Sequence, residues 1–518
     1  MRETSTTRLV ESPVVERFRP CVTAIGIALV LFVGAQSTSA AELRFARLFG
    51  DRMVLPAERP IRVWGEAPAG IEVEVSLGDQ MAQSTADAKG HWSVELPALS
   101  CSFESRKLRA HAGDEAIELS DIVVGEVWVA GGQSNMQWTL GQCLAEEPSL
   151  SAHTQLEEEV DLRWCRIDEG PAREPRVDLS APSNWRRVDD QSAGAMSAAA
   201  FFFARRLAME RRVPIGIVDT SRGGTPIEPF IPRSEFTGHP TLEAELKLGD
   251  ADDLLGLKEL PGGVFARDEA WLPGRLYHSR IEPLRGLRPM GVIWYQGESN
   301  SGQGEDPTDY RFKQAALVAG WRDAFADPEL PFHFVQLPRS GAGANWPRLR
   351  EEQRLAETPP RAGMVVTIDL EGGGIHPWNK FDVGERLARW ALLEEPYDDE
   401  SVRRCRGPRP HRIVREDDRL VIEFDSSGPI WLGRKDRFDR PSQLDEAEVP
   451  GWEIQRGDGT WETIAARLHD GGIVIAVTPE QRTAAVRYAW APQPPLECLY
   501  DDSELPLPPW SSENLETR

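Results

Sequence analysis

One serine of the chain stands where a nucleophile could act. Ser134 lies in the stretch 131–136, Gly-Gly-Gln-Ser-Asn-Met, directly after the apolar run 123–130. A run rich in β-branched residues that ends in two glycines and a serine is typical of a buried strand whose end presents a hydroxyl in a crevice. A serine hydroxyl is a weak nucleophile at neutral pH, so this interpretation requires a base from elsewhere in the chain. The alternative is an ordinary turn or helix N-cap serine.

Three further residues could complete an acyl-transfer site with this serine. Gly223, Asn300 and His376 each follow a separate apolar run. His376 would take the proton from Ser134, and an oxyanion would be held by the backbone N–H groups of Ser134 and Gly223 and by the side-chain amide of Asn300. Each residue also has a plain alternative: a turn glycine, a helix-capping asparagine and a loop histidine.

A parallel sheet would bring these residues together, because ligands of such sheets lie at the carboxyl ends of the strands. The expected strands are 123–130, 214–219, 291–296, 332–337 and 364–369. They are continuous apolar runs, as expected when helices cover both faces of a sheet. The expected helices are 198–211 and 382–393, and residues 140–192, which lack periodicity, are expected to form a long excursion from the sheet. The pattern predicts a doubly wound α/β domain.

Shorter strands with alternating apolar and polar residues flank this domain. They are expected at 61–65, 72–77 and 91–96 before it, and at 420–424, 451–454, 472–477 and 485–490 after it. Such strands, separated by Gly and Pro, indicate small β-sandwich-like modules. We therefore expect an N-terminal β domain over 42–124, the α/β domain over 125–395, and a C-terminal β domain with a loose tail over 396–518.

Composition excludes several classes of partner. With 59 Lys and Arg against 83 Asp and Glu, the net charge of −24 argues against binding to nucleic acid or to an anionic membrane. The 6 cysteines are scattered and show no metal-type pairing, and the 9 histidines form no close pair with another His or Cys. We expect no metal and no disulfide framework.

The N-terminus resembles an export signal. Basic residues precede the apolar run 21–35, and small residues at 37–41 follow it, which is the order of a secretory signal peptide. We expect residues 1–41 to be a signal peptide and the mature protein to be periplasmic or secreted. An uncleaved signal anchor is the alternative, although the apolar run is short for a membrane span.

Four motifs in this order resemble those of the sialate O-acetylesterases, a branch of the SGNH hydrolases. They are Gly-Gln-Ser-Asn-Met at 132–136, Gly-Gly-Thr-Pro-Ile-Glu at 223–228, Trp-Tyr-Gln-Gly-Glu-Ser-Asn at 294–300, and Ile-His-Pro-Trp-Asn-Lys at 375–380. The likeness extends to the stretch 48–55 near the start and 487–490 near the end. It implies an SGNH-like α/β esterase that removes acetyl groups from sugars without a cofactor.

The resemblance also implies roles for individual residues. Ser134 would be the nucleophile, His376 the base, and Gly223 and Asn300 the oxyanion hole, with Gly224 as the alternative backbone donor. The expected partner is an acetylated carbohydrate, and O-acetylated sialic acid is the leading substrate.

The sequence departs from the family at the third triad position. The family usually carries an aspartate two residues before its histidine, where this chain has Gly374. The group that orients the imidazole is therefore missing from its usual place. Asp369 and Glu371 are the nearest carboxylates, so we expect either a relocated acid or a Ser-His dyad. Smaller departures are Arg222, where the family tends to have Trp, and His278, where it tends to have Asn.

Two other functions fit the same residues. The first is an esterase that acts on acetylated plant or algal polysaccharide such as xylan or pectin. The second is a sugar-binding protein without catalytic activity, which the glycine at 374 would explain. Release of acetate from a synthetic ester distinguishes the enzymes from the binding protein.

Overall fold

The computed structural model describes residues 42–189, 192–250, 269–302, 307–357, 361–372, 374–393 and 399–515. The expected signal peptide, residues 1–41, lies outside the described residues. Residues Ala41–Arg518 form one compact unit. Among the described helices, none combines the length and the apolar character that a membrane crossing requires.

A central parallel sheet carries the strand ends of interest. In spatial order its strands are β9 (Leu162–Arg166), β11 (Ile215–Asp219), β8 (Glu115–Gly132), β12 (Gly291–Tyr295), β13 (Phe332–Val335) and β14 (Ala362–Val365), with β10 (Arg186–Arg187) antiparallel at the edge beside β9. The chain leaves β8 toward β9 and β11 and later crosses to β12 on its other side. The strand order therefore reverses at β8, and a crevice is expected at the carboxyl end of this strand.

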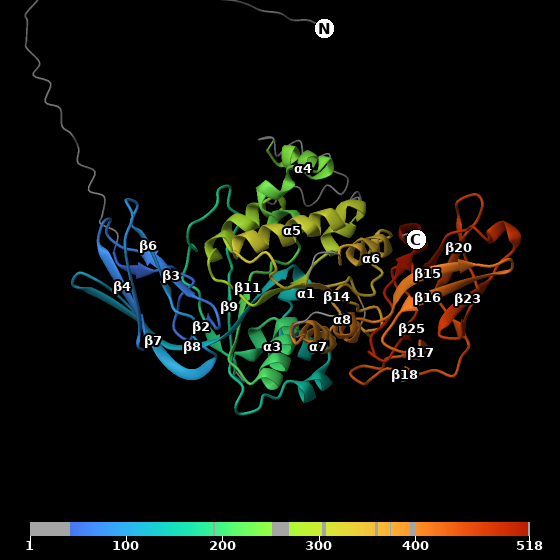
Figure 1. The fold of residues 1–518 in the computed structure, drawn as a ribbon, viewed down its shortest axis with the longest axis horizontal. Helices are drawn as coiled ribbons and strands as arrows, with labels where there is room; N and C mark the ends of the chain where they lie inside the picture. Colours follow the sequence, from blue (N-terminus) through green and yellow to red (C-terminus); the bar gives the residue numbers. More distant parts are fainter. Residues whose placement is uncertain are drawn as a thin grey trace, which may run out of the picture. The chain divides into compact units, whose positions relative to one another are not determined.

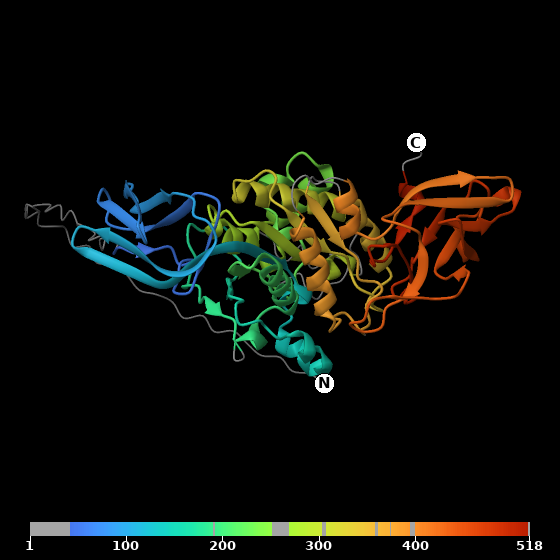
Figure 2. The same cartoon turned by 60° about the horizontal axis from the view of Figure 1, so that its bottom comes forward.

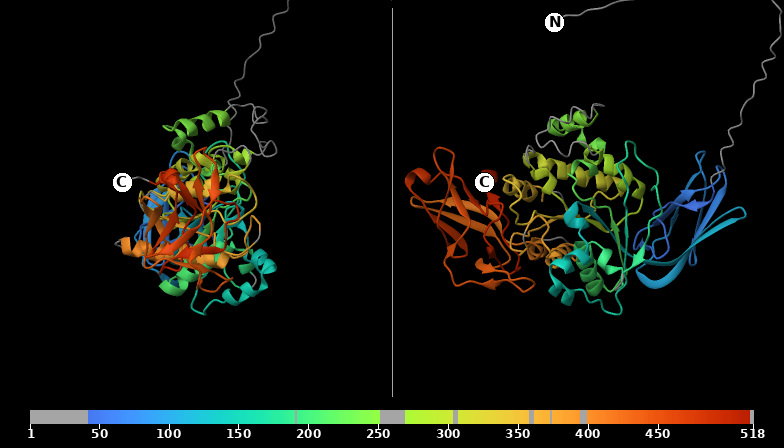
Figure 3. Two further views of the ribbon diagram at one scale, coloured as in Figure 1. Left: turned by 90° about the vertical axis from the view of Figure 1, so that its right-hand side faces the viewer. Right: turned by 180° about the vertical axis from the view of Figure 1, so that it is seen from behind.

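Helices cover both faces of the sheet, as Figures 1 and 3 show. One face carries α3 (Ala198–Arg211) and α7 (Lys380–Ala391), and the other carries α5 (Tyr310–Ala324) and α6 (Trp346–Leu355). The remaining helices are α1 (Ser134–Gln137), α2 (Leu140–Glu146), α4 (Pro240–Asp250) and α8 (Asp399–Cys405). The two helices expected from periodicity both form. Aromatic side chains fill the core on each face, since Trp128 packs against Phe203 of α3 and Trp294 against Trp321 of α5.

Strand β9 corrects one expectation. It lies within the predicted excursion 140–192 and adds a sixth parallel strand beside β11. Arg163 is the second residue of this strand and is only 2% exposed, with its guanidinium bonded to the Asp161 carboxylate. A buried charge whose partner lies two residues away interrupts the apolar run, so hydrophobic periodicity does not reveal the strand.

The N-terminal strands join the central sheet through β8. This strand is 18 residues long, pairs with β7 (Ser102–Ala112) and β2 (Val54–Pro56) in its first part, and continues into the central sheet, as Figure 2 shows. Strands β4 (Glu72–Leu77) and β5 (Gln80–Thr85) extend this layer, and β1 (Arg44–Phe45), β3 (Ile61–Glu66) and β6 (His91–Leu96) form a separate sheet. The expected boundary at 124/125 thus falls inside a continuous strand.

Three antiparallel sheets follow the central domain. The first contains β15 (Arg409–Arg415), β16 (Arg419–Asp425), β23 (Gly472–Ala476), β22 (Ala466–His469) and β19 (Glu448–Val449). The second contains β18 (Ser442–Gln443), β17 (Trp431–Arg434) and β25 (Glu497–Tyr500), and the third contains β21 (Trp461–Thr463), β20 (Trp452–Gln455), β24 (Val486–Tyr488) and β26 (Trp510–Ser511). Burial alternates along β20, where Trp452 and Ile454 are buried, so the apolar face of this strand lies in the core of this region.

Candidate active site

A tight turn at the end of β8 presents Ser134. Gly132 has φ +126°, and a Cβ at this position would lie 2.2 Å from the carbonyl oxygen of Tyr295, so only glycine fits here. The Gln133 side chain ties the turn to the end of β12, because its oxygen accepts hydrogen bonds from Gln296 Nε2 at 3.1 Å and from the Ser299 N–H at 3.2 Å. Ser134 then begins the short helix α1.

His376 lies against this serine. Its Nε2 is 2.8 Å from Ser134 Oγ, although the two residues are 242 positions apart in the sequence. The loop that follows β14 carries the histidine, and the Trp138 ring packs on the imidazole with 5.3 Å between ring centroids. A neutral imidazole at this distance can accept the hydroxyl proton, which is the geometry that general-base activation requires.

The surroundings favour the neutral imidazole. Burial lowers the pKa of His376 below its ordinary value, and the nearby Lys380 ammonium lowers this pKa further. Burial also lowers the pKa of Lys380 itself to about 8. The ammonium of Lys380 lies 4.9 Å from the ring centroid of Tyr295 and 5.7 Å from that of Trp138, within the range of cation–π contacts.

Neither expected acid reaches the histidine. The Asp369 carboxylate is fully buried and accepts two hydrogen bonds of 2.7 Å from Arg386 and one of 3.2 Å from the Tyr500 hydroxyl. Glu371 pairs instead with Arg434 at 3.8 Å. The expectation of a relocated acid at either position is therefore not met. Among the described residues, no carboxylate forms a hydrogen bond or an ion pair with His376.

Gly223 lies beside the nucleophile. A Cβ at this residue would be 3.6 Å from the Cβ of Ser134 and 2.8 Å from Gln137 Oε1. Its backbone N–H donates to that same Gln137 oxygen at 2.9 Å. The side-chain oxygen of Gln137 thus occupies this backbone donor, so another acceptor could bind to the Gly223 N–H only if Gln137 moved aside.

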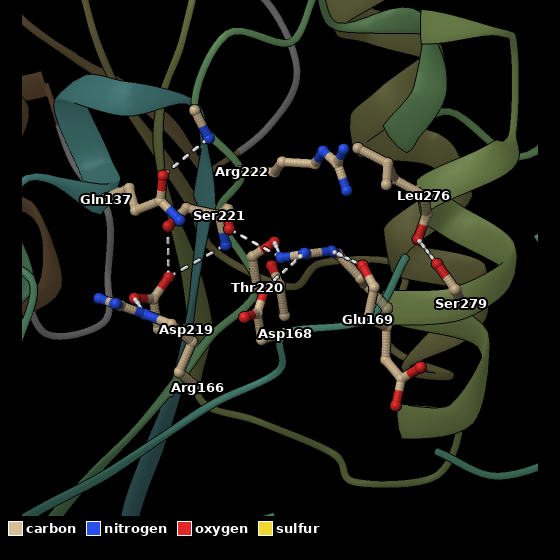
Figure 4. A network of polar contacts seen from close by, with 12 residues as sticks. Gln137, Arg166, Asp168, Glu169, Asp219, Thr220, Ser221, Arg222, Leu276 and Ser279 are labelled. Atoms are coloured by element: carbon tan, nitrogen blue, oxygen red, sulfur yellow. Dashed lines mark hydrogen bonds and ion pairs between the residues drawn. The ribbon is translucent and has the colours of Figure 1, made fainter. Parts of the chain in front are cut away.

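The loop that carries Gly223 is held by a polar network (Figure 4). Asp219, at the end of β11, accepts hydrogen bonds from the backbone N–H and the hydroxyl of Ser221. The buried Arg280 donates to the carbonyl oxygens of Thr220 at 3.2 Å and Ser221 at 2.8 Å. These contacts satisfy the backbone groups of a buried turn, which fixes the position of the glycine that follows it.

Asn300 is buried and has four hydrogen-bond contacts. Its side-chain oxygen accepts from the Ile227 N–H at 2.9 Å and from Gln296 Nε2 at 2.8 Å, while its Nδ2 donates to both oxygens of Glu228 at 2.9 and 3.1 Å. These partners fix the orientation of the amide, because exchange of its oxygen and nitrogen would oppose like groups. The donor of Asn300 is therefore directed at Glu228 in this structure.

Three functional candidates lie in the motifs but were not singled out by the sequence. Asn135, Glu298 and Lys380 form a buried polar cluster behind the Ser134–His376 pair. Asn135 and Glu298 follow the ends of β8 and β12, so a polar residue after a strand end was the available signal for these two, whereas Lys380 begins α7. His278, one of the two smaller departures from the family, is buried, and its Nδ1 lies 3.1 Å from the Ala172 carbonyl oxygen. Within the described ranges, no three His, Cys, Asp or Glu side chains are grouped so as to hold a metal ion.

Comparison with known proteins identifies the relatives of this chain. A family model described as "Carbohydrate esterase, sialic acid-specific acetylesterase" matches residues 124–392. The sialate O-acetylesterase of Rattus norvegicus is 27% identical over 555 residues, covering 94% of this chain and 98% of the rat protein, and that of Mus musculus is 28% identical over 558 residues, covering 94% and 97%. The crystal structure of a carbohydrate acetylesterase from Xanthomonas citri is similar with a TM-score of 0.76 at 29% identity, covering 91% of this chain and 99% of the other.

These findings make the protein an esterase. Since the family model matches more than half of its residues, the chain belongs to the family of carbohydrate esterases described as sialic acid-specific acetylesterases.

Proposed function

We propose that this esterase removes O-acetyl groups from sugars through a Ser134 nucleophile and a His376 base, with O-acetylated sialic acid as substrate. The observation that carries the mechanism is the 2.8 Å contact between His376 Nε2 and Ser134 Oγ. The relatives named sialate O-acetylesterase support the substrate.

The reaction proceeds in two acyl-transfer steps. His376 takes the proton of Ser134 Oγ as this oxygen attacks the acetyl carbonyl carbon, and the protonated imidazole then returns the proton to the departing sugar oxygen. Water, activated by the same imidazole, attacks the acetyl-serine and releases acetate. Since Asp369 and Glu371 are paired elsewhere, the proposal is a Ser-His dyad.

An oxyanion hole is proposed from Gly223 and Asn300. The N–H of Gly223 lies beside Ser134 and would exchange the Gln137 oxygen for the substrate oxyanion. Asn300 would contribute an amide hydrogen from a side chain whose orientation is already fixed by its buried partners. Since Asn300 Nδ2 donates to Glu228 in this structure, it would have to turn from that carboxylate to the oxyanion. One oxyanion donor typically contributes about a hundred- to a thousandfold in rate.

The arrangement and location of the protein complete the proposal. We propose an SGNH-hydrolase-like domain over 125–395, flanked by β-sandwich-like domains over 42–124 and 396–518, in a protein exported by cleavage after residue 41. Sequencing of the N-terminus of the mature protein tests the cleavage site, and an N-terminus at Met1 would contradict export by this route.

Acetate release tests the activity. Wild-type protein is expected to release acetate from an aryl acetate and from O-acetylated sialic acid, and Ser134→Ala to retain less than about one-thousandth of that rate. Equal activity of Ser134→Ala would contradict the nucleophile. A panel that includes acetylated xylo-oligosaccharides and pectin then distinguishes the sialate substrate from a polysaccharide.

A further inference from the structure

A buried amide joins the turn of the nucleophile to the loop of the base. Asn135, the residue after Ser134, is fully buried and donates from Nδ2 to the carbonyl oxygen of Ile375, the residue before His376, at 2.8 Å. The same nitrogen donates to Glu298 Oε1 in a short hydrogen bond. One side chain therefore contacts the backbone immediately before the imidazole and the end of a neighbouring strand.

The orientation of this amide is determined by its three partners. The oxygen of the amide accepts a hydrogen bond from the ammonium of Lys380, which can only donate. Its nitrogen faces the Ile375 carbonyl and the Glu298 carboxylate, whose oxygens accept. Exchanging the oxygen and the nitrogen would place like groups against one another at all three contacts. Lys380 and Glu298 are themselves 0% and 5% exposed, so water does not replace these contacts.

His376 has no other side chain of this kind to hold it. In the part of the chain that the structure describes, no carboxylate forms a hydrogen bond with the imidazole. Its Nε2 is in hydrogen-bond contact with Ser134, and its ring packs on the Trp138 ring. The loop that carries it has Gly372 and Gly374 with positive φ, at +135° and +81°, so its backbone is not restrained by side chains at these positions. Another contact must therefore restrain the backbone close to the histidine.

We infer that Asn135 is a positioning residue for the esterase reaction: supported by Lys380 and Glu298, it holds the His376 backbone so that Nε2 faces Ser134 without a triad acid. This inference rests on the proposed Ser134–His376 mechanism. It assigns to the residue beside the nucleophile the orienting task that a carboxylate performs in a triad, by contact with the backbone rather than with the imidazole.

Replacement of the amide by an acid provides the sharpest test. Asn135→Asp keeps the size of the side chain and the acceptor for Lys380 but loses both donors, so an oxygen would oppose the Ile375 carbonyl and the Glu298 carboxylate. A displacement of the base by about 1 Å costs on the order of a hundredfold in rate, so kcat for an aryl acetate should fall by about that factor, with KM changed less than about threefold. Rates are expressed per active site, counted by the burst of acyl-enzyme, because a merely structural role would lower the number of sites and leave their kcat unchanged.

The chain offers a matched control. Asn514 also donates from Nδ2 to a glutamate, Glu351, at 3.0 Å, but outside the candidate site, so Asn514→Asp makes the same chemical change there and should leave kcat unchanged. Asn135→Leu is the second variant, since it removes the donors without adding a charge and should lower kcat per site in the same way.

The outcomes separate this inference from the proposed function. If Ser134→Ala is inactive while Asn135→Asp or Asn135→Leu has wild-type kcat per site, the positioning role is wrong and the nucleophile stands. If Ser134→Ala is as active as the wild type, the proposed mechanism fails first. Loss of active sites with unchanged kcat at the remaining ones would also overturn the inference.

Discussion

Two side chains of the candidate site share one proton in the proposed mechanism. The hydroxyl of Ser134 and the Nε2 of His376 are in hydrogen-bond contact, and Trp138 shields one face of the imidazole. The ammonium of Lys380 is buried close to the pair. It donates a hydrogen bond to Asn135 and makes cation–π contacts with two aromatic rings. A buried cation close to a histidine opposes the charged imidazolium, so this surrounding favours a base that stays neutral to low pH.

The pH dependence of the reaction follows from this arrangement. The proposed mechanism requires the neutral imidazole, and both burial and Lys380 lower the pKa of His376 below 6.5, so kcat/KM should rise with pH with its midpoint on the acid side of that value. Lys380, whose pKa burial lowers to about 8, is still charged over that range. Its partners are Asn135, the Glu298 carboxylate nearby and the aromatic faces of Trp138 and Tyr295.

The variant Lys380→Met tests the effect of the ammonium through the position of the rising limb on the pH axis, whereas loss of the contact with Asn135 would lower the height of the profile. Removal of this charge should move the rising limb of kcat/KM toward higher pH, because the protonated imidazole is then opposed less. The measurement is the kcat/KM profile of both proteins between about pH 4 and 8, the range around the ordinary histidine pKa. A limb that stays in place would show that Lys380 does not act on His376 through its charge.

The absent acid leads to a second prediction. Glu371 is paired with Arg434 and is partly exposed, so Glu371→Gln should leave kcat within about twofold of the wild type, as is usual for a surface ion pair away from the reacting atoms. Steady-state kinetics on an aryl acetate measure this. A loss of activity comparable to that of a triad variant would instead identify Glu371 as the acid and contradict the dyad.

At the residue scale, the sequence indicates which side chains could react but not which side chains contact them. Ser134 and His376 can be singled out because each follows an apolar run and is of a type that acyl transfer uses. The contacts of Gln137 with the N–H of Gly223 and of Asn135 with Ile375 join residues 86 and 240 positions apart. They depend on side-chain directions that no local pattern contains.

Among the elements, the loop after β14 owes its position to two neighbours. One is α1, through the Asn135 contact described above. The other is the segment that follows β17: Lys435 pairs with Asp382 of α7 at 3.1 Å, and the Arg437 carbonyl oxygen accepts a hydrogen bond from Asn379 at 3.2 Å. The segment after β17 thus supplies a side chain and a backbone carbonyl that fix the end of the loop where α7 begins.

An aromatic contact of this segment gives the third prediction. The Phe438 ring lies 5.5 Å from that of Trp378, 5.8 Å from that of Phe381 and 4.7 Å from that of His153. Phe438→Ala removes the ring between them and should lower the free energy of unfolding by about 1 to 3 kcal/mol, less than a fully buried phenylalanine would. It should also lower kcat several-fold, because the base loop loses a support.

Denaturant unfolding and steady-state kinetics measure the two effects of Phe438→Ala. Phe103→Ala is the matched control, since Phe103 is 47% exposed on β7 and is expected to change neither quantity appreciably. A drop in stability with unchanged kcat would mean that the segment after β17 stabilises the fold but does not act on the base.

How well a helix or strand could be predicted depended on how clear its hydrophobic pattern is in the sequence. Continuous apolar strands such as β11 and β12 and the amphipathic helix α7 were evident from periodicity. Strand β9 was not, because Arg163, its second residue, is buried and paired with the Asp161 carboxylate rather than exposed. The contacts of the segment after β17 could not be predicted either, since they arise only when distant parts of the chain pack together.

For the whole molecule, buried charges connect regions that differ in fold class. Tyr500 of β25 reaches Asp369 beyond β14, and the fully buried Arg350 of α6 donates to the carbonyl oxygens of Ala491 and Pro492 at 2.9 Å each. At the other end, the continuous strand β8 belongs to both the N-terminal and the central layers. A composition shift in the sequence marks these regions, but it does not reveal that they are connected by a continuous strand and by buried hydrogen bonds.

The last prediction concerns cooperativity. Because Ala41–Arg518 is one compact unit with buried polar contacts between its regions, it should unfold in a single thermal transition. Tyr500→Phe removes one hydrogen bond to the charged Asp369 and should lower the stability by about 1.5 to 3 kcal/mol, displacing the whole transition rather than a part of it. Tyr277→Phe is the comparison: its hydroxyl accepts from the partly exposed Arg285 at 3.3 Å, outside the C-terminal strands, so its loss should displace the same single transition by less than the loss of the bond to Asp369. Calorimetry of the three proteins decides the matter. Two resolved transitions, of which Tyr500→Phe moves only one, would show that the C-terminal strands fold independently, and the support that they give to the His376 loop would then be lost before the central sheet unfolds.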